Sequence, residues 1–355
     1  MAKKSIYLPL HHGKAPYWLL SRMKKLALPI VRIIIEEFGE RELFERMSDP
    51  VFFQSFSNVL GFDWNSSGST TVLTGVLKSI LNDPNSGVDV RVAGGKGKEG
   101  LKTPEHVEKF ADELGLTSSR VEELKTLSRF AAKVDSSALQ DGYDVYHHCL
   151  IFSKKHYLVI QQGMNPATRM ARRYHWMSDF EMRCEEPHSG IAAERKENCI
   201  IDLTSRKSRE NRETALDVVR DGNFKRDYRR LLGIVRYRDG ISVPRRIDWK
   251  AVEKAYELQP SNFEELLLVR GVGRGTLRAL ALVADLIYNR EYSREDPVKY
   301  CFAVGGKDGV PFPVDRQSYD ETIEFLREAV KQAELGDFER LNALKNLQKL
   351  VSFRF

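Results

Sequence analysis

Apolar residues in the first 130 positions recur mostly at helical spacing, and polar stretches separate them. Residues 21–37 contain Pro29, so the pattern predicts a helix that is bent or interrupted at the proline. Residues 42–58 give a weaker helical pattern. Thr and Pro at positions 103–104 predict a helix start, because threonine caps helices and proline suits the first helical position. The spacing over 119–133 predicts a further helix.

Alternating or β-rich segments interrupt these helices at three places. Residues 88–92 alternate apolar and polar side chains, which is typical of a strand. Residues 143–163 are rich in β-forming residues on both sides of a polar turn at 153–156, so they predict a β-hairpin. A further short strand is expected at 199–203. Together these segments predict a small sheet in a mixed region.

From residue 211 onward the pattern is helical again. Turn residues at 239–240 and 243–244 mark the expected boundary. We therefore expect a mixed α/β domain over residues 1–240, which would probe the substrate, and a helical domain over 241–355. The helices expected in the second domain cover 248–258, 262–269, 276–288, 317–335 and 338–351. The fold class is α+β and mainly helical.

The composition is that of a globular protein with a substantial core. The chain has 355 residues, of which 42% are hydrophobic, so two domains are expected. No apolar run approaches the roughly 18 residues that a membrane span needs, and the first residues lack the pattern of a secretion signal. These features predict a cytoplasmic protein without a membrane partner.

The four cysteines show no close pair with metal-ligand spacing, and in a cytosolic chain they are expected to be reduced packing residues. A zinc site can be assembled on paper from two of them and two histidines, although their spacing fits no known pattern. Its members would be Cys184, Cys199, His175 and His188.

The positive charge is concentrated in one segment. The chain has a net charge of +6, and residues 202–246 alone contain 13 Lys/Arg against 7 Asp/Glu, an equal excess. This segment, here called the basic segment, either faces a polyanion or is a solvated helical face with interleaved acids. Ten of its cations fall in three clusters, which are Arg206, Lys207, Arg209 and Arg212; Lys225, Arg226, Arg229 and Arg230; and Arg245 and Arg246.

A glycine turn between two apolar helices is the most informative motif. Asn262 caps the first helix, and Gly271 and Gly273 permit a tight turn. The second helix starts near Gly275–Thr276 and presents unpaired N–H groups, which suit a phosphate. The alternative is an ordinary αα-corner. The residues expected to contact nucleic acid here are Arg270, Gly271, Val272, Gly273, Arg274, Gly275, Thr276 and Arg278.

Residues 263–280 resemble the helix-hairpin-helix of DNA repair glycosylases, ligases and nucleases. Such an element contacts the backbone rather than the bases, so little sequence specificity is expected. Downstream, residues 313–316 are similar to the catalytic-aspartate region of the glycosylases. The resemblance implies that Asp315 stabilises positive charge on the sugar. Gly275 replaces the Schiff-base lysine of bifunctional members, so lyase chemistry is not expected. Asp315 lies 42 residues after Gly273, about twice the spacing of that family, and the alternative role is a helix N-cap.

Polar residues around the predicted β-hairpin offer a second possible centre, a Mg²⁺ site for phosphodiester cleavage. The alternative is a sheet edge stabilised by polar pairs. The residues of this centre would be Asp144, His147, Gln161 and Asp202.

Three further groups of residues suit nucleic acid. Arg172, Arg173, Tyr174 and Trp176 combine cations and rings that could stack on unpaired bases, or they are core aromatics beside a surface arginine. The glycine-lysine runs at 94–98 and 305–307, the latter with Lys307, could each hold a phosphate or be plain turns.

Several stretches over nearly the whole chain resemble a mainly archaeal family of unknown function, which implies an archaeal-type cytoplasm. These stretches are residues 8–11, 61–64, 161–165, 171–176 and 303–309. Combined with the hairpin, they lead to a hypothesis of a DNA-binding protein of repair type that acts on damaged or distorted DNA, with a monofunctional glycosylase as one candidate. The alternatives are a Mg²⁺-dependent structure-specific nuclease and a non-catalytic DNA- or RNA-binding module. No cofactor is expected beyond Mg²⁺ for the nuclease.

Overall fold

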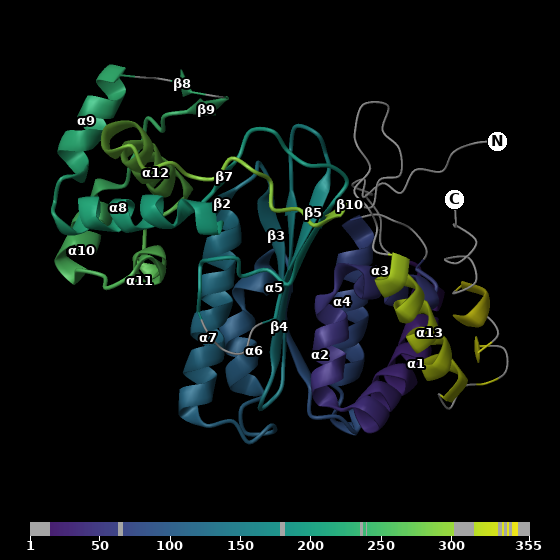
Figure 1. Cartoon of the computed structure of the whole chain (residues 1–355). Coiled ribbons are helices and arrows are strands. Elements are labelled where there is room, and N and C mark those ends of the chain that lie inside the picture. The colour runs from purple at the N-terminus through teal and green to yellow at the C-terminus, as the bar shows by residue number, and fades with distance from the viewer. Residues whose placement is uncertain are drawn as a thin grey trace, which may run out of the picture.

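A central sheet with helices on both faces organises the computed structural model (Figure 1). The structure describes residues 15–62, 67–177, 182–234, 237–238, 240–301, 316–332, 336, 339–340 and 343–346. The six-stranded sheet has the order β1-β3-β4-β5-β6-β10. Its strands are β1 (Arg91–Lys96), β3 (Asp144–Phe152), β4 (Tyr157–Met164), β5 (Ala171–Trp176), β6 (Gly190–Ala193) and β10 (Tyr300–Cys301). The predicted mainly helical α+β class is confirmed.

The sheet is antiparallel except for its last pair, in which β10 runs parallel to β6. Strands β3 and β4 form the predicted β-hairpin, with Cys149 opposite Ile160 and an irregularity between Val145 and His147. The first predicted strand lies slightly later than expected, at β1. The expected strand at 199–203 is only β7 (Ile201–Asp202), which pairs with β2 (Leu139–Gln140) outside the main sheet.

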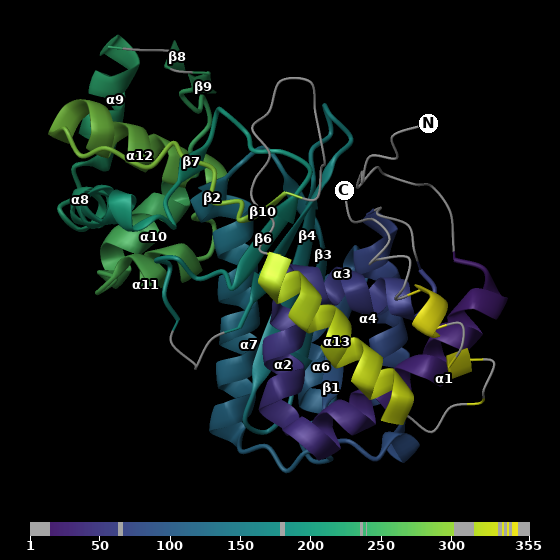
Figure 2. The same cartoon turned by 45° about the vertical axis from the view of Figure 1, so that its right-hand side comes forward.

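One face of the sheet carries the N-terminal helices. They are α1 (Tyr17–Ile33), the π-helix η1 (Ile34–Phe38), α2 (Glu40–Ser48), α3 (Pro50–Val59) and α4 (Ser67–Leu81). Helix α13 (Arg316–Gln332), from the C-terminal part, packs against α1 and α3 (Figures 1 and 2). The expected interruption at Pro29 is wrong, because α1 continues through it.

The other face is covered by α6 (Thr103–Lys109) and α7 (Ser118–Lys133), with the short α5 (Lys98–Leu101) beside them. The two faces of the sheet belong to two hydrophobic cores, and successive residues of β3 alternate between them. Cys149 and Ile151 belong to the first core, which includes the N-terminal helices. Leu150 and Phe152 belong to the second core, which includes α7. Helix α7 ends in a π-helical turn, η3 (Val134–Ala138).

A helical lobe extends the second core away from the sheet (Figure 1). We call it the hairpin lobe, and it consists of α8 (Arg209–Arg220), α9 (Phe224–Ile234), α10 (Trp249–Leu258), α11 (Phe263–Leu268) and α12 (Arg274–Tyr288). Helices α8 and α9 pack on α12, so the predicted boundary at residue 240 falls inside this lobe. A pair of two-residue strands, β8 (Tyr237–Arg238) and β9 (Ile241–Ser242), lies between α9 and α10.

The chain enters and leaves the hairpin lobe at neighbouring points. The amide of Asp202, in β7, donates to the carbonyl of Ser293 over 2.9 Å. The amide of Ser293 in turn donates to the Ser208 hydroxyl over 2.8 Å. The 3-10 turn η4 (Arg206–Ser208) therefore lies beside the segment through which the chain returns toward β10. No helix in the described part of the chain combines the length and apolar character needed to cross a membrane.

Candidate nucleic-acid interface

The predicted glycine turn joins two helices of the hairpin lobe. Asn262 caps α11 as expected, with its side-chain oxygen accepting from the amide of Glu265 over 2.8 Å. Helix α11 ends at Leu268 and α12 begins at Arg274, so residues 269–273 form what we call the hairpin turn. Arg270 and Gly271 are exposed, whereas the Val272 side chain is buried and holds the turn to the core.

The two glycines of the hairpin turn have different structural requirements. Gly271 has φ +95°, and a Cβ there would lie 2.7 Å from Cβ of Ala251, so the fold itself requires glycine. Gly273 has φ −128°, and the nearest atom to an added Cβ would be 3.9 Å away. Gly273 therefore tolerates a side chain, and the fold alone does not explain the glycine.

Several amide groups in the hairpin turn and in the first turn of α12 have no acceptor among the described residues. The Val272 amide donates to the Val269 carbonyl over 3.1 Å. Within the described residues, no acceptor is found for the amides of Gly271, Gly273, Arg274 and Gly275. The last two belong to the first turn of α12, a 15-residue helix whose N-terminus has a partial positive charge. Because Gly273, Arg274 and Gly275 are only partly covered, this turn offers N–H donors to an anion.

The hairpin turn is fixed to the rest of the molecule on one side. The Lys133 ammonium donates to the Val272 carbonyl over 2.6 Å, and Gln140 Nε2 donates to the Arg274 carbonyl over 2.9 Å. These bonds use carbonyl oxygens and leave the amides of the turn available. Gln140 also accepts from Arg278 Nε over 2.8 Å. The carbonyl oxygens of Val272 and Arg274 thus attach the turn and the start of α12 to the rest of the protein.

Two of the three arginines predicted to contact phosphate are engaged within the protein. The Arg274 guanidinium donates to Asp144 Oδ1 over 2.8 Å and to the Tyr143 carbonyl over 3.0 Å. Arg278 is bound to Gln140, as described above. Arg270 is exposed and forms no ion pair with the described residues. Arg270 is therefore the freest of the three cations.

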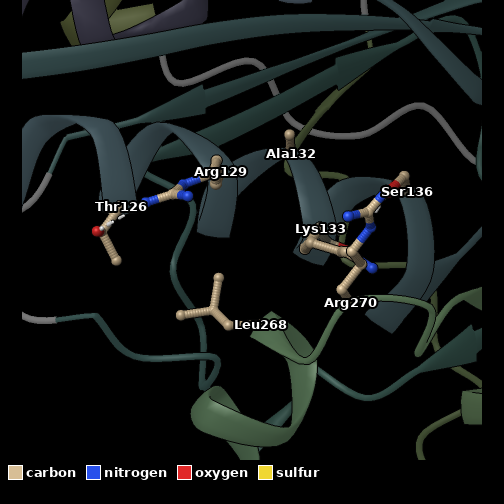
Figure 3. Close-up of a pocket in the computed structure, with 7 residues that line it drawn as sticks. All are labelled: Thr126, Arg129, Ala132, Lys133, Ser136, Leu268 and Arg270. Carbon is tan, nitrogen blue, oxygen red and sulfur yellow. Dashed lines mark hydrogen bonds between the residues drawn. The ribbon is translucent and has the colours of Figure 1, made fainter. Parts of the chain in front are cut away.

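A groove lies between α7 and the hairpin turn (Figure 3). Its volume is about 570 Å³. Figure 3 shows the Arg270 side chain beside Lys133 and Ser136, and the Arg129 side chain extended toward Thr126. We call this the cation groove, and its lining residues are Thr126, Arg129, Ala132, Lys133, Ser136, Leu268 and Arg270.

The cation groove contains positive charge without a compensating carboxylate. None of its lining residues is acidic, and Arg129, Lys133 and Arg270 form no ion pair with the described residues. Partial burial lowers the pKa of the Lys133 ammonium. Sequence reasoning missed Arg129 and Lys133, because they lie in an ordinary amphipathic helix far from the glycine motif. Only the packing of α11 on α7 brings them to the turn.

The basic segment differs from the groove, because six of its ten clustered cations are paired with acids. Arg206, Arg209 and Arg212 all contact Glu185, with Arg209 at 2.5 Å and Arg212 at 2.7 Å. Lys207 pairs with Glu295, and Arg226 and Arg230 pair with Asp227. Much of this segment is therefore a solvated face with compensating acids. Near its end, the Arg246 carbonyl lies close to Gly275.

The residues proposed for a Mg²⁺ centre are not brought together. Asp144 is exposed and pairs with Arg274, whereas His147 is buried against the Thr74 hydroxyl. Gln161 is buried between His148 and Asp135, and Asp202 belongs to the separate β2–β7 pair and accepts from Thr204. Among the described residues, no group of three or more His, Cys, Asp or Glu side chains is placed to hold a metal ion. This prediction is corrected: the strand register separates its members.

The zinc alternative is also corrected, because no group of three or more His, Cys, Asp or Glu side chains in the described part of the chain could hold a metal ion. Cys184 is buried and Cys199 is exposed, so they do not share a site. His175 accepts from Arg173 Nε, and His188 lies 2.5 Å from Asp135. Each histidine therefore has a partner in the core.

The expectation that β5 offers stacking residues to bases is also corrected. Arg172, Arg173, Tyr174 and Trp176 are all buried, because β5 is an inner strand with helices over both faces. Arg172 pairs with Asp141 at 3.0 Å and Asp296 at 2.6 Å, which compensates the cost of burying its charge. Tyr174 donates to Asp141, and Trp176 donates to Asp135.

Arg173 points to the opposite face, where its hydrogen bonds go to neutral groups and its charge interacts with the Asp49 carboxylate. It donates to the Pro50 carbonyl over 3.2 Å and to His175, and it lies over the Phe53 ring. These contacts are structural, so the arginines and rings of β5 are not available at the surface.

The two glycine-lysine runs have different outcomes. In the first, the Gly94 amide donates to His106 Nδ1 over 3.1 Å and the Gly97 amide donates to the Tyr146 carbonyl over 2.7 Å. These amides are used by the fold, so this run is not a phosphate loop. Lys307 of the second run lies outside the described residues.

Asp315 also lies outside the described residues. Helix α13, which begins one residue later, packs on α1 and α3, on the face of the sheet opposite α6 and α7 (Figure 2). The hairpin turn belongs to the other core.

Comparison with known proteins adds a family but no activity. No curated protein and no solved structure matches the chain. One family, described as a protein of unknown function (DUF763), matches residues 4–314. The match covers the sheet, the N-terminal helices and the whole hairpin lobe. The chain therefore belongs to the DUF763 family.

Proposed function

We propose that this protein binds nucleic acid through its sugar–phosphate backbone, with the hairpin turn and the adjoining cation groove as the contact surface. One observation carries the proposal. The partly exposed amides at the start of α12 have no acceptor among the described residues, and they adjoin a groove lined by three cations that form no ion pair with those residues. Amide donors at a helix N-terminus and unpaired cations are both suited to phosphate.

The chemistry favours backbone contacts over base contacts. The hairpin turn supplies main-chain donors and the groove supplies cations. Both kinds of group bind phosphate, and contacts to phosphate do not distinguish one base from another. We therefore expect binding with little sequence preference and a strong dependence on salt. Duplex DNA is the first ligand to test, since the resemblance to repair proteins suggests it. RNA is the alternative, because no feature of the turn distinguishes the two sugars.

Replacement of Gly273 tests this proposal, since the fold tolerates a side chain there. Asp and Asn both cap helices well and have nearly the same shape. We expect Gly273→Asp to weaken binding by roughly 30-fold, about 2 kcal/mol, because its carboxylate would repel the phosphate and compete for the amides. Gly273→Asn should weaken binding much less. Fluorescence anisotropy with labelled duplexes of unrelated sequence measures both.

Thermal unfolding of both variants provides the control. If both unfold at the wild-type temperature and Gly273→Asp binds as tightly as wild type, the hairpin turn is only structural and the proposal is wrong. Equal losses in the Asp and Asn variants would indicate steric blocking and would still place the ligand at the turn.

Action on damaged or distorted DNA, by base excision at Asp315 or by Mg²⁺-dependent cleavage, rests on the sequence alone. Incubation with lesion-bearing and branched DNAs, with and without Mg²⁺, separates these activities. Alkali-dependent breaks that Asp315→Asn abolishes would support excision, and direct Mg²⁺-dependent breaks would support cleavage. Binding without either product would identify a non-catalytic module.

A further inference from the structure

We propose that the cation groove binds a phosphate monoester, and that its ligand is the terminal phosphate of a strand held by the hairpin turn. This inference rests on the proposed function and specifies the kind of nucleic acid that the site recognises. It depends on the charge of the groove, on its donors and on its position beside the turn.

The charge of the groove exceeds that of one internal phosphate. A phosphodiester has a single negative charge, whereas a phosphate monoester carries about −1.5 to −2 at neutral pH. Lys133 and Arg270 bring two positive charges to one end of the groove, and none of the lining residues is acidic. Arg129 lines the same groove, but its side chain extends toward Thr126, away from these two cations. Two cations that form no ion pair with the described residues match a dianion better than a monoanion.

The donors of the groove also fit three terminal oxygens. Arg270 has a planar fork that can contact two oxygens, whereas the Arg129 guanidinium donates to the Lys125 carbonyl and the Thr126 hydroxyl. Lys133 uses one of its three protons on the Val272 carbonyl, so two remain. The Ser136 hydroxyl lies on the same side as Lys133 (Figure 3), where it contacts the Lys133 carbonyl over 3.4 Å and the Ser137 hydroxyl over 3.3 Å. An internal phosphodiester has only two free oxygens and would leave several of these donors unused.

The groove has room for more than a phosphate group. It is partly open to solvent, and its volume is about 570 Å³. Ala132 and Leu268 contribute apolar surface to the lining, on which the sugar of a terminal nucleotide can pack. The site is therefore suited to the phosphate together with its nucleoside.

The position of Lys133 connects the groove to the hairpin turn. Its ammonium lies 2.6 Å from the Val272 carbonyl, and the next residue, Gly273, begins the row of unpartnered amides. A terminal phosphate in the groove is consequently close to the turn. A strand that ends in the groove can place its following phosphate on those amides.

The test compares short oligonucleotides that differ only at their ends. Single strands and duplexes with a 5′-phosphate, a 3′-phosphate or hydroxyl ends are titrated against the full chain. We expect one terminal phosphate to increase affinity by roughly tenfold over hydroxyl ends, about 1.4 kcal/mol. Inorganic phosphate and a nucleoside monophosphate serve as competitors, to distinguish a strand end from a free small molecule.

The double variant Arg129→Gln/Arg270→Gln should lower the ratio of phosphate-ended to hydroxyl-ended affinity to about one. A matched control, Lys207→Gln/Arg230→Gln, removes two cations that are already paired with acids and should retain the ratio. Thermal unfolding confirms that both variants fold. Equal binding of phosphate and hydroxyl ends by the wild type would overturn this inference while leaving the proposed function intact.

Two other outcomes are also decisive. If a free nucleoside monophosphate binds as tightly as the phosphate-ended strand, the groove takes a phosphate monoester, but the strand end is not its source. If no oligonucleotide binds at all, the proposed function fails together with this inference.

Discussion

The basic segment and the cation groove differ in how well the sequence predicts which cations are free of acidic partners. The basic segment is conspicuous in the sequence, yet one acid, Glu185, contacts all three of Arg206, Arg209 and Arg212. The cation groove is not visible in the sequence, because its cations come from α7 and from the hairpin turn. Its charges nevertheless have no acidic partner among the described residues. Charge that binds a polyanion is therefore determined by neighbours in the fold rather than by density along the chain.

The physical reason is competition. A phosphate that approaches a paired arginine must replace a carboxylate that already satisfies it, so the net gain is small. The pKa of Glu185 is lowered to about 2, mainly by its hydrogen bond with Arg209. Glu185 therefore stays ionised, and continues to compensate the arginines, at any pH at which the protein would be studied. The groove cations have no carboxylate to replace: Lys133 and Arg129 donate to neutral oxygens, and Arg270 is exposed.

The largest expected effect is a difference between charge reversals in the two regions. Arg129→Glu/Arg270→Glu should weaken binding of a phosphate-ended duplex by roughly 100-fold, about 2.7 kcal/mol, because it replaces attraction by repulsion at the contact. Lys207→Glu/Arg230→Glu makes the same change in net charge and should weaken binding only about threefold through the long-range field. Anisotropy titrations at one salt concentration measure both. Similar losses would show that only net charge matters.

A smaller effect concerns the dependence of binding on salt. Each phosphate charge that the protein neutralises on duplex DNA contributes roughly 0.9 to the slope of log affinity against log salt. Arg129→Gln/Arg270→Gln should reduce the magnitude of this slope by about one to two. Lys207→Gln/Arg230→Gln should leave it nearly unchanged. An unaltered slope in the groove variant would mean that the groove is not in contact with phosphate.

The smallest effect would come from making the basic segment resemble the groove. Glu185→Gln removes the acid that compensates three arginines and should increase affinity at low salt by about twofold to threefold. Asp217→Asn, on α8, makes the same change in charge, although Asp217 forms no ion pair with the described residues. Only the Glu185 variant should bind more tightly beyond the effect of net charge. Identical behaviour of the two variants would argue against pairing as the cause.

Local patterns were sufficient for the elements whose signals lie within a short segment. The β3–β4 hairpin follows from its β-forming residues, and the cap at Asn262 and the glycine turn locate α11 and α12 within a few residues. Strand β5 is not predicted from the sequence, in which its cations and rings suit base stacking or core aromatics beside a surface arginine. Arg172 can be buried because of Asp141 and Asp296, which lie far away in the sequence.

The candidate site was predictable only in part, for the same reason. The hairpin turn is a local motif and was found, whereas Arg129 and Lys133 join it through helix packing. The engagement of Arg274 with Asp144 was not predictable either, because the two residues come from α12 and β3. Distant pairs of this kind determine which of the predicted cations remain available.

The adjacent entry and exit of the hairpin lobe have a consequence for how such a protein can be modified. The chain leaves after β7 and returns at Ser293, and the two connections are hydrogen-bonded to each other. Insertions with neighbouring ends are the kind that hosts accommodate most readily. The lobe is therefore an insertion whose two ends lie side by side. A lobe with another ligand preference could be inserted between the same two points without a change in the order of the six strands.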